Sequence, residues 1–144
     1  MDIRSAEIVI WGEKAYVPSN ARVPSGLFAD IEPVFVVDPT LSELIPIVQK
    51  VLSSKPKSLS LEEIEVHRGL LPRITGARSW KRLGEKGICY IIDVTDKGYL
   101  VEMSRLDKKG RWEFDPDKRK TFPPGTDLSI VVQAILDDLK TRLI

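Results

Sequence analysis

Two apolar stretches near the start of the chain are separated by a signal for a tight turn. Residues 7–10 and 14–17 have the pattern of short strands, and Trp11-Gly12-Glu13 lies between them. Gly12 supplies the backbone freedom that such a turn needs. The pattern therefore predicts a β-hairpin, followed by a loop at Pro18-Ser19-Asn20.

Residues 27–37 form the next extended segment. The alternation along residues 27–32 has the period of a strand. Pro33 cannot donate a hydrogen bond between strands, so it marks an edge, a bulge or a break. The continuous apolar run Val34–Val37 predicts a strand that is covered on both faces.

Two helices are predicted from capping-box spacings, in which Thr or Ser precedes Glu by three residues. The first begins after Thr40 and has apolar residues at helical spacing through Leu52. Pro46 conflicts with that start because it would remove an interior hydrogen bond, whereas a start at Ser42 would place it in the first turn. The second helix begins after Ser60 and ends before Gly69.

The sequence pattern in the second half of the chain predicts interruptions of regular structure, then an antiparallel meander and a final helix. Residues 70–76 have the composition of irregular structure, and residues 79–83 could form one helical turn. The meander and its turns are predicted at 88–94, 96–98, 99–103, 108–110, 111–114 and 118–122. Thr126 or Asp127 caps the last helix.

That last helix is amphipathic. It has one apolar face and one solvent-exposed face, which carries Asp137, Asp138, Lys140 and Arg142. The element order lacks β-α-β alternation. It indicates one α+β domain over residues 1–144, with an antiparallel sheet and helices packed mainly on one side.

Charge and composition narrow the function classes. Lys and Arg number 22 against 21 Asp and Glu, so overall charge alone would not hold the chain on nucleic acid. The chain shows neither a signal-peptide pattern nor an apolar run long enough to span a bilayer. A single cysteine rules out an intrachain disulfide and fits a reducing compartment. We expect a cytoplasmic protein with no membrane partner.

The sequence contains few of the residues and motifs that are typical of catalytic sites. One histidine, His67, and one cysteine, Cys89, cannot supply the usual zinc ligands, and Cys89 lies in an apolar strand where a thiol is inert. No phosphate-binding glycine loop is present. The pairs Asp115/Asp117 and Asp137/Asp138 are expected in a solvated turn and on a solvated helix face. We therefore expect no enzyme activity, no catalytic residue, no metal and no cofactor.

Basic residues surround two tryptophans. Arg78, Lys81 and Arg82 lie near Trp80, and further Lys and Arg residues flank Trp112. Basic and aromatic side chains together can bind nucleic acid. The alternative hypothesis for the function is therefore a nucleic-acid-binding module. Interspersed acidic residues make nucleic acid the less favoured partner. Trp80 is expected in the core, and Trp112 either anchors a partner or covers the end of the core.

Three segments resemble the immunity proteins of bacterial contact-dependent growth inhibition (CDI) systems. They are KAYVPSNARVPSGLFADIEPVFVV, ARSWKRLGEKGICYII and RWEFDPDKRKTFPPGTDL. The resemblance implies a small cytoplasmic antidote that binds the toxic C-terminal domain of its own system's effector, often a nuclease. It carries no binding residue over, because each antidote matches its own toxin. Antidotes to nucleases are often acidic, whereas this chain is nearly neutral.

If the resemblance holds, we expect the segment from Arg105 to Lys120 to form part of the contact surface. The candidate toxin-binding residues are Arg105, Lys108, Arg111, Trp112, Asp115 and Asp117. We expect a protein partner and a monomer when the chain is free.

Overall fold

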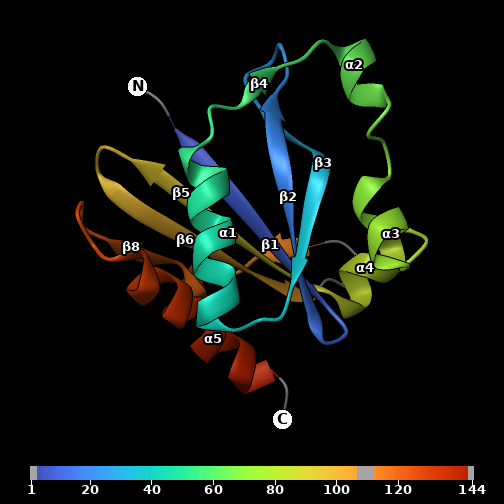
Figure 1. Cartoon of the computed structure of the whole chain (residues 1–144). Helices are drawn as coiled ribbons and strands as arrows, with labels where there is room; N and C mark the ends of the chain where they lie inside the picture. The colour runs from blue at the N-terminus through green and yellow to red at the C-terminus, as the bar shows by residue number, and fades with distance from the viewer. Residues whose placement is uncertain (1–2, 107–111, 143–144) are drawn as a thin grey trace.

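A computed structural model describes residues 3–106 and 112–142. Its main feature is an open sheet in the order β3-β2-β1-β5-β6, with β7 and β8 both paired to β6 (Figure 1). The strands are β1 (Arg4–Trp11), β2 (Lys14–Arg22), β3 (Phe28–Val37), β4 (Lys57–Ser58), β5 (Ile88–Thr95), β6 (Gly98–Leu106), β7 (Trp112–Phe114) and β8 (Lys120–Phe122). Neighbouring strands run antiparallel, except β4, which runs parallel to β2. The predicted α+β class with an antiparallel sheet is confirmed.

The first hairpin forms where the sequence places it. β1 and β2 pair from Val9↔Tyr16 to Trp11↔Lys14, and Gly12 adopts a φ of +62° in the turn between them. A positive φ is costly for residues with a Cβ, so glycine suits this position. The predicted turn at 108–110 lies outside the described residues.

Strand β3 is the edge of the sheet, which accounts for Pro33 within it. The β2–β3 register shifts between Pro18 and Ser19, where an irregularity interrupts the pairing. The predicted coverage of Val34–Val37 on both faces holds in part. Phe35 and Val37 pack on one face of the sheet and Val34 on the other, but Val36 is 48% exposed.

The two long helices begin at the predicted caps. Helix α1 (Leu41–Ser53) follows Thr40, whose hydroxyl accepts a hydrogen bond from the Glu43 N–H, and it continues through Pro46 rather than starting at Ser42. Helix α5 (Leu128–Arg142) follows Asp127, whose carboxylate accepts from the Ser129 N–H at 2.9 Å. Both caps satisfy backbone donors that the helix itself leaves unpaired.

Helices α1 and α5 pack together on one face of the sheet (Figure 1). Alternate positions of β1, β5 and β6 point to this face, as the period of a strand requires. The largest buried side chains between the sheet and these helices are Ile8, Val17, Leu44, Val48, Tyr90, Ile92, Met103 and Ile135. This face holds the main core.

Short helices lie along the other side of the molecule, at the right of Figure 1. They are α2 (Leu61–Glu65), α3 (Leu70–Thr75) and α4 (Trp80–Lys86). The irregular structure predicted for 70–76 is wrong: Gly69 and Gly76 adopt left-handed conformations that bracket a helical turn. Pro72 is tolerated because it lies in that first turn.

Helices α3 and α4 cover a second, smaller cluster on the opposite face of the sheet, built on Val9, Leu71, Ala77, Leu83 and Cys89. Helix α4 continues through Gly84 and ends at Lys86, with Gly87 as its C-cap, beyond the predicted single turn. Within the two described ranges, every helix is too short or too polar to span a bilayer.

Candidate protein-binding surface

Of the predicted contact residues, Arg105 on β6 and Asp115 just after β7 belong to one ion-pair cluster. Arg105 and Glu113 face each other in the strand register, and their charged groups are 3.2 Å apart. The Arg105 guanidinium also lies 4.0 Å from the Asp115 carboxylate. Lys108 and Arg111 lie outside the described residues. The structure therefore brings together Arg105 and Asp115 from the predicted set.

Trp112 is a structural residue as well as a surface residue. Its indole N–H donates to the Gly87 carbonyl at 3.2 Å, and its ring packs on the smaller core cluster. Trp80 is instead 51% exposed, so its predicted place in the core is wrong. Helix α4 reaches the core through Leu83 and Gly84, which leaves Trp80 at the margin.

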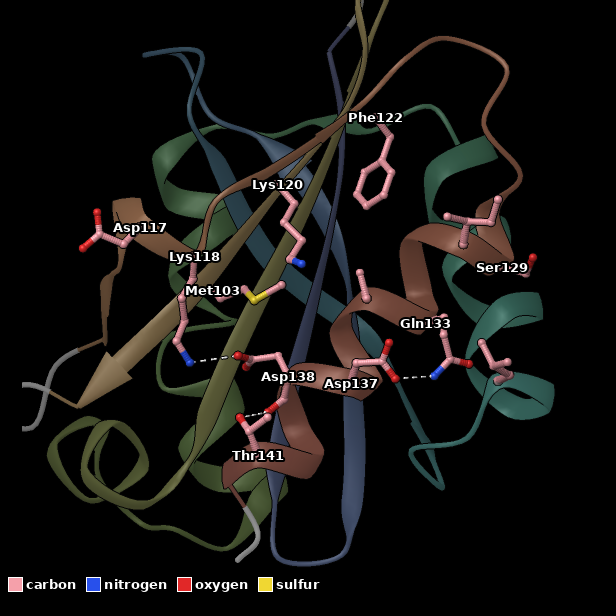
Figure 2. Close-up of a pocket in the computed structure, with 13 residues that line it drawn as sticks. Met103, Asp117, Lys118, Lys120, Phe122, Ser129, Gln133, Asp137, Asp138 and Thr141 are labelled. Carbon is pink, nitrogen blue, oxygen red and sulfur yellow. Dashed lines mark hydrogen bonds and ion pairs between the residues drawn. The ribbon is translucent and has the colours of Figure 1, made fainter.

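Asp115 connects the ion-pair cluster to a groove on the α5 side. Its carboxylate accepts from the Asp117 N–H at 3.0 Å and so caps the 3-10 turn η1 (Pro116–Lys118). This turn places Lys118 beside α5, and β8 continues the same wall (Figure 2). Asp117 lies at the outer rim, with its carboxylate turned away from α5.

The groove has a volume of about 850 Å³ and lies between η1, β8 and α5. Its lining residues are Leu41, Met103, Asp117, Lys118, Lys120, Phe122, Ser129, Ile130, Gln133, Ala134, Asp137, Asp138 and Thr141. Ile130 is 55% exposed. Phe122 and Lys120 project from β8 into the groove (Figure 2). An apolar centre with a charged rim is the usual make-up of a protein-binding patch.

Asp138 is the centre of a polar network at the base of the groove. Its carboxylate accepts hydrogen bonds from the Tyr90 hydroxyl, the Lys118 ammonium and the Arg142 guanidinium, each at 2.8 Å. Burial alone would raise the pKa of Asp138, but the bonds from Lys118 and Tyr90 and the charge of Arg142 lower it overall. The Asp138 side chain is 10% exposed, so its predicted place on a solvent-exposed face is wrong.

A cavity lined by carboxyl groups lies where no sequence pattern predicts a site. Glu7, Asp30 and Asp93 line about 440 Å³ on the sheet face opposite α1 and α5, together with Ser5 and Asn20. Burial, followed by the charge of Asp30, raises the pKa of Glu7 well above its ordinary value. Burial also raises the pKa of Asp30 and of Asp93. The charge of Asp30 acts on Glu7 in addition to burial, so both carboxyls favour the protonated form more than free carboxyls do.

Cys89 lies beneath this cavity and is 1% exposed, as predicted for a small apolar residue. Its thiol donates to the Glu7 carboxyl at 3.5 Å, and burial raises its pKa well above that of a free thiol. A thiol in this state is a poor nucleophile. Among the described residues, no three His, Cys, Asp or Glu side chains are placed to hold a metal ion together.

The fold is similar to those of known proteins, although the sequence matches no protein-family model and no curated protein. A Neisseria meningitidis protein of unknown function, NMB0488, has 10% identity and a TM-score of 0.66, over 92% of this chain and 91% of that one. A chain of the CdiA-CT/CdiI toxin and immunity complex from Yersinia pseudotuberculosis has 10% identity and a TM-score of 0.64, over 93% and 94%. These likenesses show a shared fold.

Proposed function

We propose that this chain is an immunity protein that binds and neutralises the toxic C-terminal domain of its cognate contact-dependent growth inhibition effector. The observation that carries the proposal is the likeness, over nearly the whole of both chains, to a chain of a CdiA-CT/CdiI toxin and immunity complex. Three segments of the sequence resemble the same class of protein. Neutralisation requires a complementary surface and no turnover, and we place the protein in the bacterial cytoplasm, where a delivered toxin acts.

The proposed contact surface is the groove beside α5 together with the β6–β7 ion-pair cluster. Ile130 and Phe122 supply apolar contacts and Asp117 supplies a charge at the rim of the groove, while Arg105 and Asp115 belong to the ion-pair cluster. Lys108 and Arg111 belong to the same proposed surface. Because Lys118 and Asp138 already pair with each other, they hold the shape of the groove rather than provide free charge.

We further propose that the toxin is a nuclease. A nuclease must attract the phosphate backbone with basic side chains. The carboxyl groups of Asp117 and Asp137 at the groove provide acidic partners for such side chains. The near-neutral total charge is then no obstacle, because complementarity depends on the local patch rather than on the sum.

Co-expression tests the function. The chain is produced in cells together with a toxin domain encoded directly upstream of it, and survival and co-purification are measured. The proposal expects survival and a stable complex of one toxin domain with one copy of this chain. Cell death in the presence of abundant folded protein, with no complex recovered, would contradict it.

A pair of substitutions tests the surface. Ile130→Glu places a charge on the groove, whereas Leu27→Glu places one at another exposed apolar side chain, between β2 and β3. A charge in the apolar centre of an interface typically weakens binding by tenfold or more, on the order of 2 kcal/mol. Weakened toxin binding by Ile130→Glu alone supports the groove. Equal affinity of the two variants removes the groove from the contact surface.

A further inference from the structure

A further hollow lies among the helices on the face of the sheet opposite the groove. It has a volume of about 470 Å³ and lies between α3 and α4. The α3–α4 basin, as we call it, is lined by Gly69, Pro72, Arg73, Gly76, Arg78, Ser79 and Trp80. Two arginines and an indole ring therefore meet in one concave surface, on the other side of the sheet from α5.

Trp80 is held in position although it is half exposed. Its ring meets that of Trp112 edge to face, with the centroids 6.4 Å apart. Trp112 is itself fixed by the bond from its indole N–H to the Gly87 carbonyl. An exposed tryptophan that is already ordered loses little conformational entropy on binding, which is a property of interface anchors.

Arg78 has an unusual backbone for an arginine. Its φ is +74°, in the left-handed region that is costly for a residue with a Cβ. Its N–H donates to the Pro72 carbonyl at 3.0 Å, which holds the turn closed at the basin. Within the described ranges, the Arg78 guanidinium makes no hydrogen bond or ion pair. Strained residues with an unused charge concentrate where a ligand binds.

Positive charge gathers around this basin. Residues 68–86 contain six Lys or Arg and a single acidic residue, Glu85, so their net charge is +5. Because the whole chain has a net charge of +1, the remaining residues together carry −4. Arg73 has a single, long contact with Glu32 at 3.5 Å, and both side chains are more than half exposed. Arg68 and Lys81 are also in exposed ion pairs, with Glu65 and Glu85. Within the described ranges, the charged groups of Arg78, Arg82 and Lys86 are in no ion pair and are available to a partner.

The neighbouring surface favours a polypeptide over a nucleic acid. Leu61, Val66 and Ile74 are exposed on and beside α2 and α3, and aliphatic side chains offer bases nothing on which to stack. Apolar anchors with arginines around them are typical of protein interfaces.

We propose that the α3–α4 basin is a second recognition site, which takes an acidic polypeptide segment. A carboxylate of that segment pairs with Arg73 and Arg78, and an adjacent apolar side chain packs on Trp80. The site lies on the face opposite the groove proposed for the toxin and does not depend on that proposal. It gives the chain the means to hold two protein surfaces at once.

In the test, a synthetic peptide of alternating Glu and Leu residues is added to the full chain up to millimolar concentration. Binding is followed by ¹H–¹⁵N NMR of the protein. Amide shifts confined to residues 69–80, together with a change in Trp80 fluorescence, are expected. Arg78→Gly removes the guanidinium while glycine suits the positive φ, so the variant stays folded. Its affinity should fall about tenfold, as expected for one lost charge-assisted contact. Lys97→Gln, in the exposed turn between β5 and β6, is the matched loss of charge and should bind normally.

Four results would overturn the site. One is the absence of shifts at residues 69–80 with millimolar peptide. Another is equal affinity of Arg78→Gly and the wild type. The third is that a Lys-Leu peptide binds as well as the Glu-Leu peptide. The fourth is that single-stranded oligo-dT binds the basin more tightly, which would make the surface a nucleic-acid site.

Discussion

The indole rings of Trp80 and Trp112 meet edge to face, with centroids 6.4 Å apart and planes at 85°. The two residues nevertheless have different environments. Trp112 packs on the smaller core cluster and donates a hydrogen bond to Gly87, while Trp80 is half exposed above it. The pair therefore joins a structural tryptophan to one that is available to a partner.

Unequal stability effects follow for the two tryptophans. Trp112→Ala should lower the free energy of unfolding by roughly 3 kcal/mol, because it leaves a cavity and an unpaired Gly87 carbonyl. Trp80→Ala should cost about 1 kcal/mol, the value of an aromatic pair at a partly exposed site. Urea unfolding followed by far-UV circular dichroism measures both. Equal losses would show that Trp80 is as buried as Trp112.

Asp138 should be the most sensitive carboxylate of the α5 side. Asp138→Asn removes the charge that accepts from Lys118, Tyr90 and Arg142, and should destabilise the protein by roughly 2–3 kcal/mol at neutral pH. Tyr90→Phe removes one of the three bonds and serves as a milder control, at about 1 kcal/mol. Chemical denaturation at pH 7 measures the two variants.

The pH dependence of this effect has a definite sign. The folded-state pKa of Asp138 is lowered, so the folded protein binds fewer protons there than the unfolded chain. Its contribution is therefore present above the ordinary pKa of aspartate and is lost as pH falls through the lowered folded pKa. The stability gap between wild type and Asp138→Asn should shrink in acid. A gap that is constant down to strongly acidic pH would contradict the assignment.

Local signals predicted the elements well. The turn at Gly12 and the caps at Thr40, Ser60 and Asp127 each depend on residues a few positions apart, and all four are present. The α3 helix was missed because Pro72 normally breaks helices, and only its position in the first turn removes that conflict.

The site features depend on contacts that no local pattern contains. Asp138 is buried because β5 brings Tyr90 and η1 brings Lys118 to it. Glu7 and Asp30 meet because β1 and β3 flank β2, whose pairing with β3 shifts register beside Pro18. Of the predicted contact residues, the sequence could group Arg105 with Asp115, since both belong to one meander. Their role in binding stays a prediction.

Cys89 should be unreactive toward thiol reagents in the folded protein. It is fully covered, and its pKa is raised by burial and by the neighbouring Glu7. Ellman's reagent should therefore react only through opening of the structure, at a rate that rises with added urea. Fast labelling in the absence of denaturant would show that the cavity above Cys89 admits the reagent.

The carboxyl pair of Glu7 and Asp30 should make the protein less stable as pH rises. Both folded-state pKa values are raised, so the folded protein holds more protons than the unfolded chain between the ordinary carboxyl pKa and the raised one. The contribution of the pair is fully present below the ordinary pKa and is lost as pH rises through the folded pKa.

Glu7→Gln tests this dependence, because the amide keeps a donor for Asp30 and an acceptor for the Cys89 thiol without an ionisation. We expect it to stabilise the protein at pH 7 by on the order of 1 kcal/mol, the value of one pKa unit, and to be neutral in acid. Glu62→Gln, on exposed α2, is the matched control and should change nothing. Chemical denaturation between pH 4 and pH 8, about the range from carboxyl titration to neutrality, measures the difference. A destabilising Glu7→Gln at pH 7 would mean that the ionised carboxylate is required, and the carboxyl cavity would then hold a charge rather than a protonated carboxyl.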